Sequence, residues 1–185
     1  MPSRKKFYIA TDHAGFAIKD FVKDVVTGLG CEIIDLGPDS DERVDYPDFA
    51  KKCARKVVED KGSFGILICG TGIGISIAAN KVPGVRAALC HDTYTAKLTR
   101  FHNDANILCF GERVVGKGVI EDMIETFIKT EFEGGRHAGR VGKIVYQNPG
   151  GILSEVKLDK DTGTGWPRYY KDDDMAKHER DKTEA

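Results

Sequence analysis

The sequence predicts an α/β protein with a parallel β-sheet, and two observations support this fold class. Short apolar runs alternate with amphipathic segments of about 10–15 residues, the pattern of strands connected by crossover helices. Polar and glycine-rich motifs follow directly after several of the apolar runs. Because ligands of parallel sheets bind beyond the carboxyl ends of the strands, we expect these motifs to meet at one edge of the sheet.

The first half of the chain contains three predicted strands and three predicted helices. Phe16, Phe21 and Val25 fall near helical spacing. Pro47 suits the first turn of the second helix. The predicted strands cover residues 7–10, 31–36 and 64–69, and the predicted helices cover residues 16–28, 47–60 and 72–81.

The second half continues the alternation with two further strands, which makes five in all. Pro83 and Gly84 end the preceding helix. The predicted strands cover residues 85–90 and 106–110, and the predicted helices cover residues 92–101, 115–131 and 133–144. The last of these helices is predicted despite the glycines near its start.

Apolar periodicity is lost after about Tyr146, where the sequence becomes polar, charged and rich in glycine. We therefore expect one domain over residues 1–146 and a polar C-terminal extension over residues 147–185. Such a segment buries little apolar surface, so we expect it to be partly disordered or to lie against the surface.

Composition and charge exclude several function classes. The chain has 185 residues, 41% of them hydrophobic, and a formal net charge of −1, which argues against a protein held to nucleic acid or acidic lipid by charge. No apolar stretch approaches the roughly 18 residues that cross a bilayer, and no signal peptide is evident. The five cysteines include no Cys-x-x-Cys pair, which favours reduced thiols over disulfides or a zinc site. We expect a soluble cytoplasmic protein that binds neither nucleic acid nor a membrane.

The strongest chemical signal is a thiol followed by a glycine-rich turn. Cys69 ends an apolar run, and the turn after it comprises Gly70, Thr71, Gly72, Ile73 and Gly74. Backbone N–H groups at such a turn stabilise anions such as a phosphate, a thiolate or an enediolate. The simpler alternatives are a buried apolar cysteine and a tight turn without function. Three glycines beside a thiol favour an anion cradle next to a general base.

Asp12 and His13 follow the first predicted strand. They are either ligand contacts at the carboxyl edge of the sheet or an N-cap aspartate beside a solvent-facing histidine. His102 and Asn103 follow a predicted helix. They could shuttle a proton and donate to an oxyanion, or they form an exposed polar loop.

Arg136 and Arg140 lie four residues apart, so they share one face of a helix. Together they could grip a phosphate, although a solvated basic face is the simpler interpretation. Arg113, after the last predicted strand, is a third candidate cation.

Together these segments resemble the type B ribose-5-phosphate isomerases and the related subunits of galactose-6-phosphate isomerase, over residues 6 to about 146. The matching motifs lie at residues 11–15, 45–47, 68–81, 100–106, 110–116 and 133–137. The resemblance implies a three-layer αβα sandwich with a five-stranded parallel sheet, of the Rossmann-like or flavodoxin-like kind. It also implies interconversion of ribose 5-phosphate and ribulose 5-phosphate in the pentose phosphate pathway, without a metal or cofactor. The resemblance also implies a homodimer, or a dimer of dimers, with the active site at the subunit interface and a sugar phosphate as the ligand.

The resemblance further implies roles for the candidate residues. Cys69 would be the base that moves a proton between C2 and C1, and His102 would open the furanose ring. At an interface site, His102 and some of the arginines can come from the partner chain. The implied substrate contacts are the loop N–H groups of residues 70–74 with Asn103 at the enediolate, Asp12 at the sugar hydroxyls, Tyr46 at the pocket wall, and His13, Arg113, Arg136 and Arg140 at the phosphate.

Three alternatives stay open at this point. The first is an isomerase of a six-carbon sugar phosphate, such as galactose or allose 6-phosphate, which differs in pocket depth. The second is a non-catalytic phosphosugar-binding module, against which the combination of Cys69, His102 and Asn103 argues. The third is a flavodoxin-like cofactor protein, although the sequence contains no flavin-stacking pattern.

Overall fold

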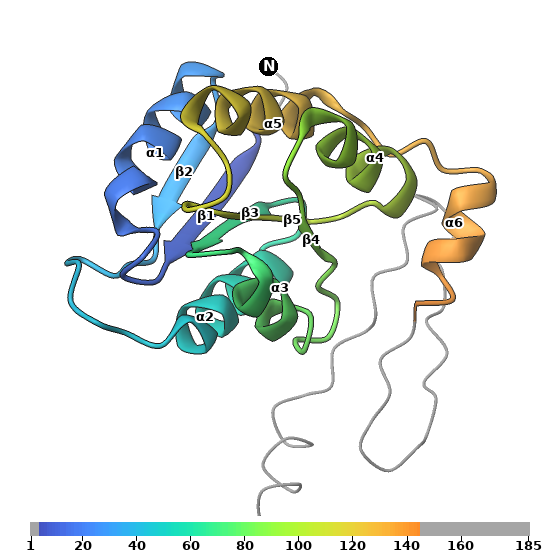
Figure 1. Cartoon of the computed structure of the whole chain (residues 1–185). Coiled ribbons are helices and arrows are strands. Elements are labelled where there is room, and N and C mark those ends of the chain that lie inside the picture. The colour runs from blue at the N-terminus through green and yellow to red at the C-terminus, as the bar shows by residue number, and fades with distance from the viewer. Residues whose placement is uncertain (1–3, 145–185) are drawn as a thin grey trace, which may run out of the picture.

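The computed structural model describes residues 4–144, which form a five-stranded parallel sheet between two layers of helices (Figure 1). The predicted three-layer αβα class is therefore confirmed. The proposed extension over residues 147–185 lies outside the described residues.

The strands and helices follow the predicted alternation. The strands are β1 (Lys6–Thr11), β2 (Glu32–Asp35), β3 (Phe64–Cys69), β4 (Ala87–Leu89) and β5 (Ile107–Gly111). The helices are α1 (Lys19–Gly28), α2 (Tyr46–Glu59), α3 (Ile73–Ala79), α4 (Thr93–Asn103), α5 (Lys117–Lys129) and α6 (Arg136–Val141), and a short 3₁₀ helix over Phe16–Ile18 precedes α1.

The strand order in the sheet is β2-β1-β3-β5-β4. Every residue of β5 is buried, which suits its inner position, whereas the three residues of β4 are half-buried. A short strand exposes few unpaired backbone groups, so β4 suits the edge of the sheet. The chain leaves β1 toward β2 on one side and returns to β3 on the other side, so the order reverses between β1 and β3. Ligands of open α/β sheets bind at such a switch point.

Each face of the sheet has its own apolar core. Side chains along a strand point alternately to opposite faces, so Phe7 and Ile9 of β1 pack with α1, α4 and α5, whereas Tyr8 and Ala10 pack with α2 and α3. Figure 1 shows these two groups of helices on opposite sides of the sheet. α6 lies outside both layers and contacts α4.

Two predicted helices differ from the observed ones. The helix expected over residues 16–28 is present, but its first turn, Phe16–Ile18, is a 3₁₀ helix that continues directly into α1. The helix expected over residues 133–144 is reduced to α6, because Gly134 and Gly135 adopt φ angles of +70° and +53°. These are left-handed conformations that a right-handed helix cannot contain.

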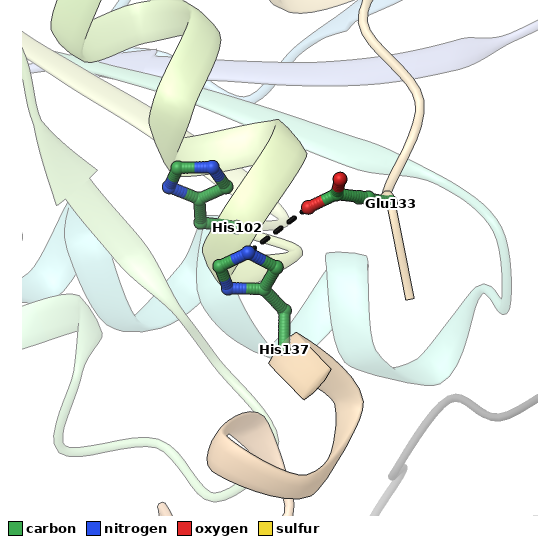
Figure 2. A group of neighbouring side chains, drawn as sticks. All are labelled: His102, Glu133 and His137. Atoms are coloured by element: carbon green, nitrogen blue, oxygen red, sulfur yellow. Dashed lines mark ion pairs between the residues drawn. The ribbon is translucent and has the colours of Figure 1, made fainter. Parts of the chain in front are cut away.

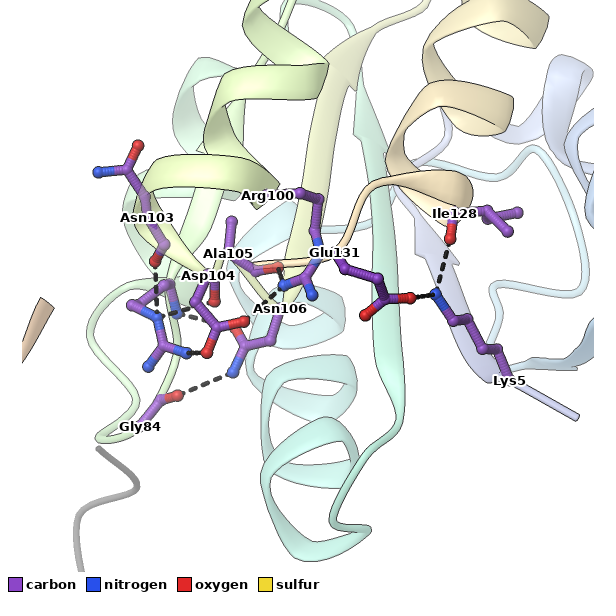
Figure 3. Close-up of polar contacts among 10 residues, drawn as sticks. Lys5, Gly84, Arg100, Asn103, Asp104, Ala105, Asn106, Ile128 and Glu131 are labelled. Atoms are coloured by element: carbon purple, nitrogen blue, oxygen red, sulfur yellow. Dashed lines mark hydrogen bonds and ion pairs between the residues drawn. The ribbon is translucent and has the colours of Figure 1, made fainter. Parts of the chain in front are cut away.

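A buried ion-pair network joins α4 to the starts of β4 and β5 (Figure 3). Arg100 Nη1 lies 2.8 Å from Asp104 Oδ1, and Arg86 Nη2 lies 2.8 Å from Asp104 Oδ2. Arg100 also donates to the Ala105 carbonyl at 2.7 Å. Asp104 has a φ of +47°, a conformation that aspartate and asparagine tolerate better than other non-glycine residues.

Asp104→Asn is expected to lower the free energy of unfolding by roughly 2–4 kcal/mol, because it removes the buried negative charge that pairs with two arginines while it keeps the backbone conformation. Chemical denaturation measures the change. Asp122→Asn, an exposed position on α5, is the matched control. A loss for Asp104→Asn no larger than that of the control would show that the network contributes little to stability.

Within residues 4–144, no helix combines the length and apolar character needed to cross a membrane.

Candidate active site

The switch point between β1 and β3 brings Asp12 next to Cys69. The Asp12 N–H donates to the carbonyl of Ile68 at 3.2 Å. This hydrogen bond links the residue that follows β1 to the end of β3. Asp12 is 6% exposed, and its Oδ1 accepts hydrogen bonds from the N–H groups of Ala14 at 2.9 Å and Gly15 at 3.1 Å. Within the described residues its Oδ2 accepts no hydrogen bond, which leaves this oxygen available to a ligand hydroxyl.

Cys69 ends β3 on the face covered by α2 and α3. The residue is 4% exposed, and the N–H of Gly72 donates to its Sγ at 3.1 Å. An N–H group aimed at sulfur stabilises negative charge there. The sulfur therefore has a hydrogen-bond donor aimed at it from the glycine-rich loop.

Two glycines allow the loop after Cys69 to form. Gly72 has a φ of +77°, and a Cβ at this position would lie 2.7 Å from the carbonyl carbon of Phe110. A Cβ at Gly111 would lie 2.5 Å from the carbonyl carbon of Thr71. Both contacts involve backbone atoms, which cannot move aside as a side chain can, so the sequence needs glycine at these positions.

The loop presents unpaired donors beside two predicted substrate contacts. In the part of the chain that the structure describes, the N–H groups of Thr71 and Gly74 have no acceptor. Tyr46 is 39% exposed, and its ring lies against the loop, since a Cβ at Gly74 would be 2.6 Å from its Cζ. The Arg113 guanidinium lies over Gly70, where a Cβ would be 3.3 Å from Nη1.

His13 reaches the aspartate-rich loop before α2. Its Nδ1 lies 3.2 Å from the carbonyl oxygen of Val44 and 3.4 Å from the Val44 nitrogen, and the tautomer decides which contact is a hydrogen bond. We call Asp12, His13, Tyr46, Cys69, the loop of residues 70–74 and Arg113 the carboxyl-edge group.

The remaining predicted site residues lie on α4 and α6, away from Cys69. We call them the amino-edge group: His102, Asn103, Arg136 and Arg140. His102 and Asn103 form the last turn of α4, not a loop after it as expected. The His102 ring stacks on that of His137 with a centroid distance of 4.1 Å and an interplanar angle of 7°. His137 Nε2 lies 2.9 Å from Glu133 Oε2 (Figure 2).

The arginines of the amino-edge group flank this stack on α6. Arg136 and Arg140 are both exposed, and Arg136 Nε lies 3.3 Å from His137 Nε2. The side chain of Asn103 points away from the network of Figure 3, while its carbonyl accepts from Arg86 Nε at 3.1 Å.

His102, Glu133 and His137 offer ligand atoms within 4.8 Å of one another. A metal ion binds in the plane of an imidazole ring, and two nearly parallel rings cannot both aim at one ion. The arrangement therefore suits a ring stack better than a shared metal ion.

Within one chain, the carboxyl-edge group lies at the carboxyl ends of the strands and the amino-edge group lies at their amino ends. Cys69 pairs with Gly111 at the end of β5. Asn103 contacts Arg86, which immediately precedes β4, and the N–H of Ile107 at the start of β5 donates to the carbonyl of Arg86. β5 alone separates the edges by roughly 13 Å, at about 3.3 Å per residue. A single chain therefore does not bring His102 to Cys69.

Two residues of this region were not among the predicted site residues. Glu133 and His137 contact each other only because Gly134 and Gly135 turn the chain between them. The available signal was the i,i+4 spacing of a glutamate and a histidine within the helix predicted over residues 133–144, because residues at that spacing share one helix face.

The comparisons with known proteins identify the family. A model described as ribose/galactose isomerase matches residues 7–144. The chain belongs to this family. The predicted resemblance is therefore confirmed, and with it the expectation that the chain is an isomerase.

Individual members of the ribose/galactose isomerase family align with this chain over most of their length. Ribose-5-phosphate isomerase B of Escherichia coli is 46% identical over 140 residues, which are 76% of this chain and 94% of that relative. The structure of Clostridium thermocellum ribose-5-phosphate isomerase B superimposes with a TM-score of 0.73 and 54% sequence identity. The match covers 75% of this chain and 94% of the C. thermocellum chain. The Trypanosoma brucei type B enzyme is 50% identical with a TM-score of 0.75, and covers 77% of this chain and 97% of its own.

Proposed function

We propose that this member of the ribose/galactose isomerase family interconverts D-ribose 5-phosphate and D-ribulose 5-phosphate through an enediolate, as a step of the pentose phosphate pathway. The observation that carries the proposal is the Cys69 thiol, which accepts the Gly72 N–H at the switch point of the sheet. The names of the E. coli and C. thermocellum relatives support the substrate.

Proton transfer at carbon is the proposed chemical step. The Cys69 thiolate removes the proton from C2 of the open-chain aldose, and the electron pair forms the C1–C2 double bond while O1 becomes negative. The N–H groups of Thr71 and Gly74, which have no acceptor within residues 4–144, are available to stabilise that oxygen. The thiol then returns the proton to C1, a proton moves from O2 to O1, and the ketose forms. All atoms balance without an external oxidant or reductant, so the proposal includes no cofactor and no metal.

The remaining carboxyl-edge residues bind the substrate in this proposal. Asp12 Oδ2 takes a sugar hydroxyl, Tyr46 forms a wall, and His13 and Arg113 bind the phosphate. Phosphate binding is remote from C1 and C2, so it positions the substrate without taking part in the reaction.

We propose a homodimer, or a dimer of such dimers, in which the amino-edge group of one chain completes the carboxyl-edge group of its partner. His102 then opens the furanose by taking the C1 hydroxyl proton and protonating the ring oxygen. Asn103 donates to the enediolate, and Arg136 and Arg140 hold the phosphate. Ile73 (51% exposed) lies in the catalytic loop and Ile77 (56% exposed) lies one turn further along α3, and together they offer an apolar contact surface.

We also propose a cytoplasmic location, because all five cysteines are free and buried. Reduced thiols are typical of that compartment. We further propose that the enzyme domain covers residues 1–146 and that residues 147–185 are an extension, since the family match ends at residue 144.

Metal-stripped protein is expected to convert ribose 5-phosphate to ribulose 5-phosphate, because no step requires a metal. Coupled detection of the ketose measures the rate, with galactose 6-phosphate and allose 6-phosphate assayed in parallel. Turnover of the pentose phosphate is expected to be at least about 10-fold more efficient, the scale on which a pocket separates substrates of different length. No turnover of any of the three would contradict the proposed function.

The second candidate function is isomerisation of a six-carbon sugar phosphate, which the galactose part of the family description favours. It uses the same thiol and loop, and differs in the space left for one more carbon. A higher kcat/KM for either six-carbon phosphate in the same assay would replace the first candidate by this one.

A further inference from the structure

The His102 imidazole rests on a second, more deeply buried imidazole. His137 is 5% exposed, whereas His102 is half-buried. The rings are nearly parallel, with an interplanar angle of 7° and a centroid distance of 4.1 Å. At this separation the flat face of His137 limits the tilt of His102, and the two side chains come from different elements, α4 and α6 (Figure 2).

Glu133 holds the His137 ring in place. Its Oε2 lies 2.9 Å from His137 Nε2, and its N–H donates to the carbonyl of Phe101 at 3.0 Å. The same residue therefore contacts His137 through its side chain and α4, next to His102, through its backbone. The His137 N–H donates to the carbonyl of Gly134 at 2.9 Å, which ties the start of α6 to the turn after Glu133.

We propose that His137, held by Glu133, is a positioning residue that sets the orientation of the His102 ring for opening the sugar furanose. This inference rests on the proposed function, because it assigns to His137 an effect on the step that His102 performs.

The charges around His137 agree with this role. Burial lowers the pKa of His137, and its neighbours His102, Arg136 and Arg140 act in the same direction, while Glu133 opposes them. An uncharged His137 can stack on His102 without like-charge repulsion when His102 takes up a proton.

The chemistry of the two sugars separates ring opening from proton transfer at carbon. Ribose 5-phosphate closes to a furanose through its C4 hydroxyl. Ribulose 5-phosphate carries its carbonyl at C2 and its phosphate at O5, so it stays open. A defect in positioning His102 should therefore slow the conversion of the ribose phosphate, while Cys69 still exchanges a C1 proton of ribulose 5-phosphate with solvent.

The test compares His137→Ala with wild-type protein in two assays: turnover of ribose 5-phosphate, and deuterium uptake at C1 of ribulose 5-phosphate in D₂O. We expect kcat for ribose 5-phosphate to fall by about 10–100-fold, the range for a misplaced catalytic group, and deuterium uptake to stay within about two-fold of the wild-type rate. Lys143→Ala, an exposed position just after α6, is the matched control. His137→Phe, which keeps a flat ring, should recover part of the lost turnover.

A double variant checks that His137 acts through His102. If it does, His137→Ala in a His102→Ala background should add no further loss to the turnover of ribose 5-phosphate. An additive loss would overturn the proposal.

Other outcomes would also overturn it. Equal loss in both assays would mean that His137 supports the whole site, and a higher KM for both sugars would make it a phosphate ligand. Unchanged turnover would show that His102 needs no platform. If His137→Ala does not fold, as judged by circular dichroism, Glu133→Gln in the same two assays decides by the same criteria. Failure of the proposed function is distinguishable, because wild-type protein would then neither convert ribose 5-phosphate nor take up deuterium.

Discussion

Cys69→Ala is expected to lower kcat for ribose 5-phosphate by about 10³-fold, in the range for loss of a general base. The substitution removes the sulfur that accepts the Gly72 N–H, which is the proposed proton acceptor. It does not remove a proposed phosphate contact, so substrate should still bind. Because the variant hardly turns over, calorimetry with ribose 5-phosphate itself can measure that binding.

Cys31→Ala is the matched control. Cys31 is also a buried free thiol, but it lies in the core on the opposite face of the sheet. Its loss should affect stability by a similar amount and leave kcat near the wild-type value. Substantial turnover by folded Cys69→Ala protein would exclude the thiol as the base.

A mixture of two inactive variants is expected to regain activity. In the proposed dimer, one site takes Cys69 from the first chain and His102 from the second, and the other site the reverse. When Cys69→Ala and His102→Ala chains are co-expressed in equal amounts, half of the dimers are mixed, and one of the two sites in each mixed dimer is intact. Turnover should therefore reach about one quarter of the wild-type rate per chain.

Co-purification with two different affinity tags isolates the mixed dimer, whose rate should be about half of the wild-type rate. Two Cys69→Ala chains with different tags, purified in the same way, control for the tags. If each site lay within one chain, the mixed dimer would be as inactive as its parents, and the shared site would be refuted.

The sequence predicted that Asp12, Cys69 and Arg113 lie at the same edge of the sheet, and the structure places them there. Asp12, Cys69 and Arg113 each follow a strand, and parallel strands end at the same edge. The apolar pattern locates the end of each strand, and the parallel arrangement of the strands brings these ends together. No contact between distant helices had to be predicted to place these residues.

The amino-edge group was harder to place. His102 appeared to follow a helix, but it belongs to the last turn of α4, and a helix that follows a parallel strand runs back to the opposite edge of the sheet. The His102–His137 stack depends on the turn made by Gly134 and Gly135, whose positive φ angles do not follow from their being glycines. The strand order, with β5 between β3 and β4, was likewise not determined by periodicity, which reports what each strand buries and not its neighbours.

The isoleucines of α3 bear on how this enzyme can evolve. Ile73 and Ile77 are exposed on the chain described here, and Ile73 belongs to the loop that follows Cys69. If the partner chain covers them, selection for turnover is also selection for association, because one seven-residue helix serves both. Substitutions that weaken the association of the two chains would then also lower turnover. The amino-acid sequence of this surface should therefore change more slowly in evolution than that of the exposed side of α5.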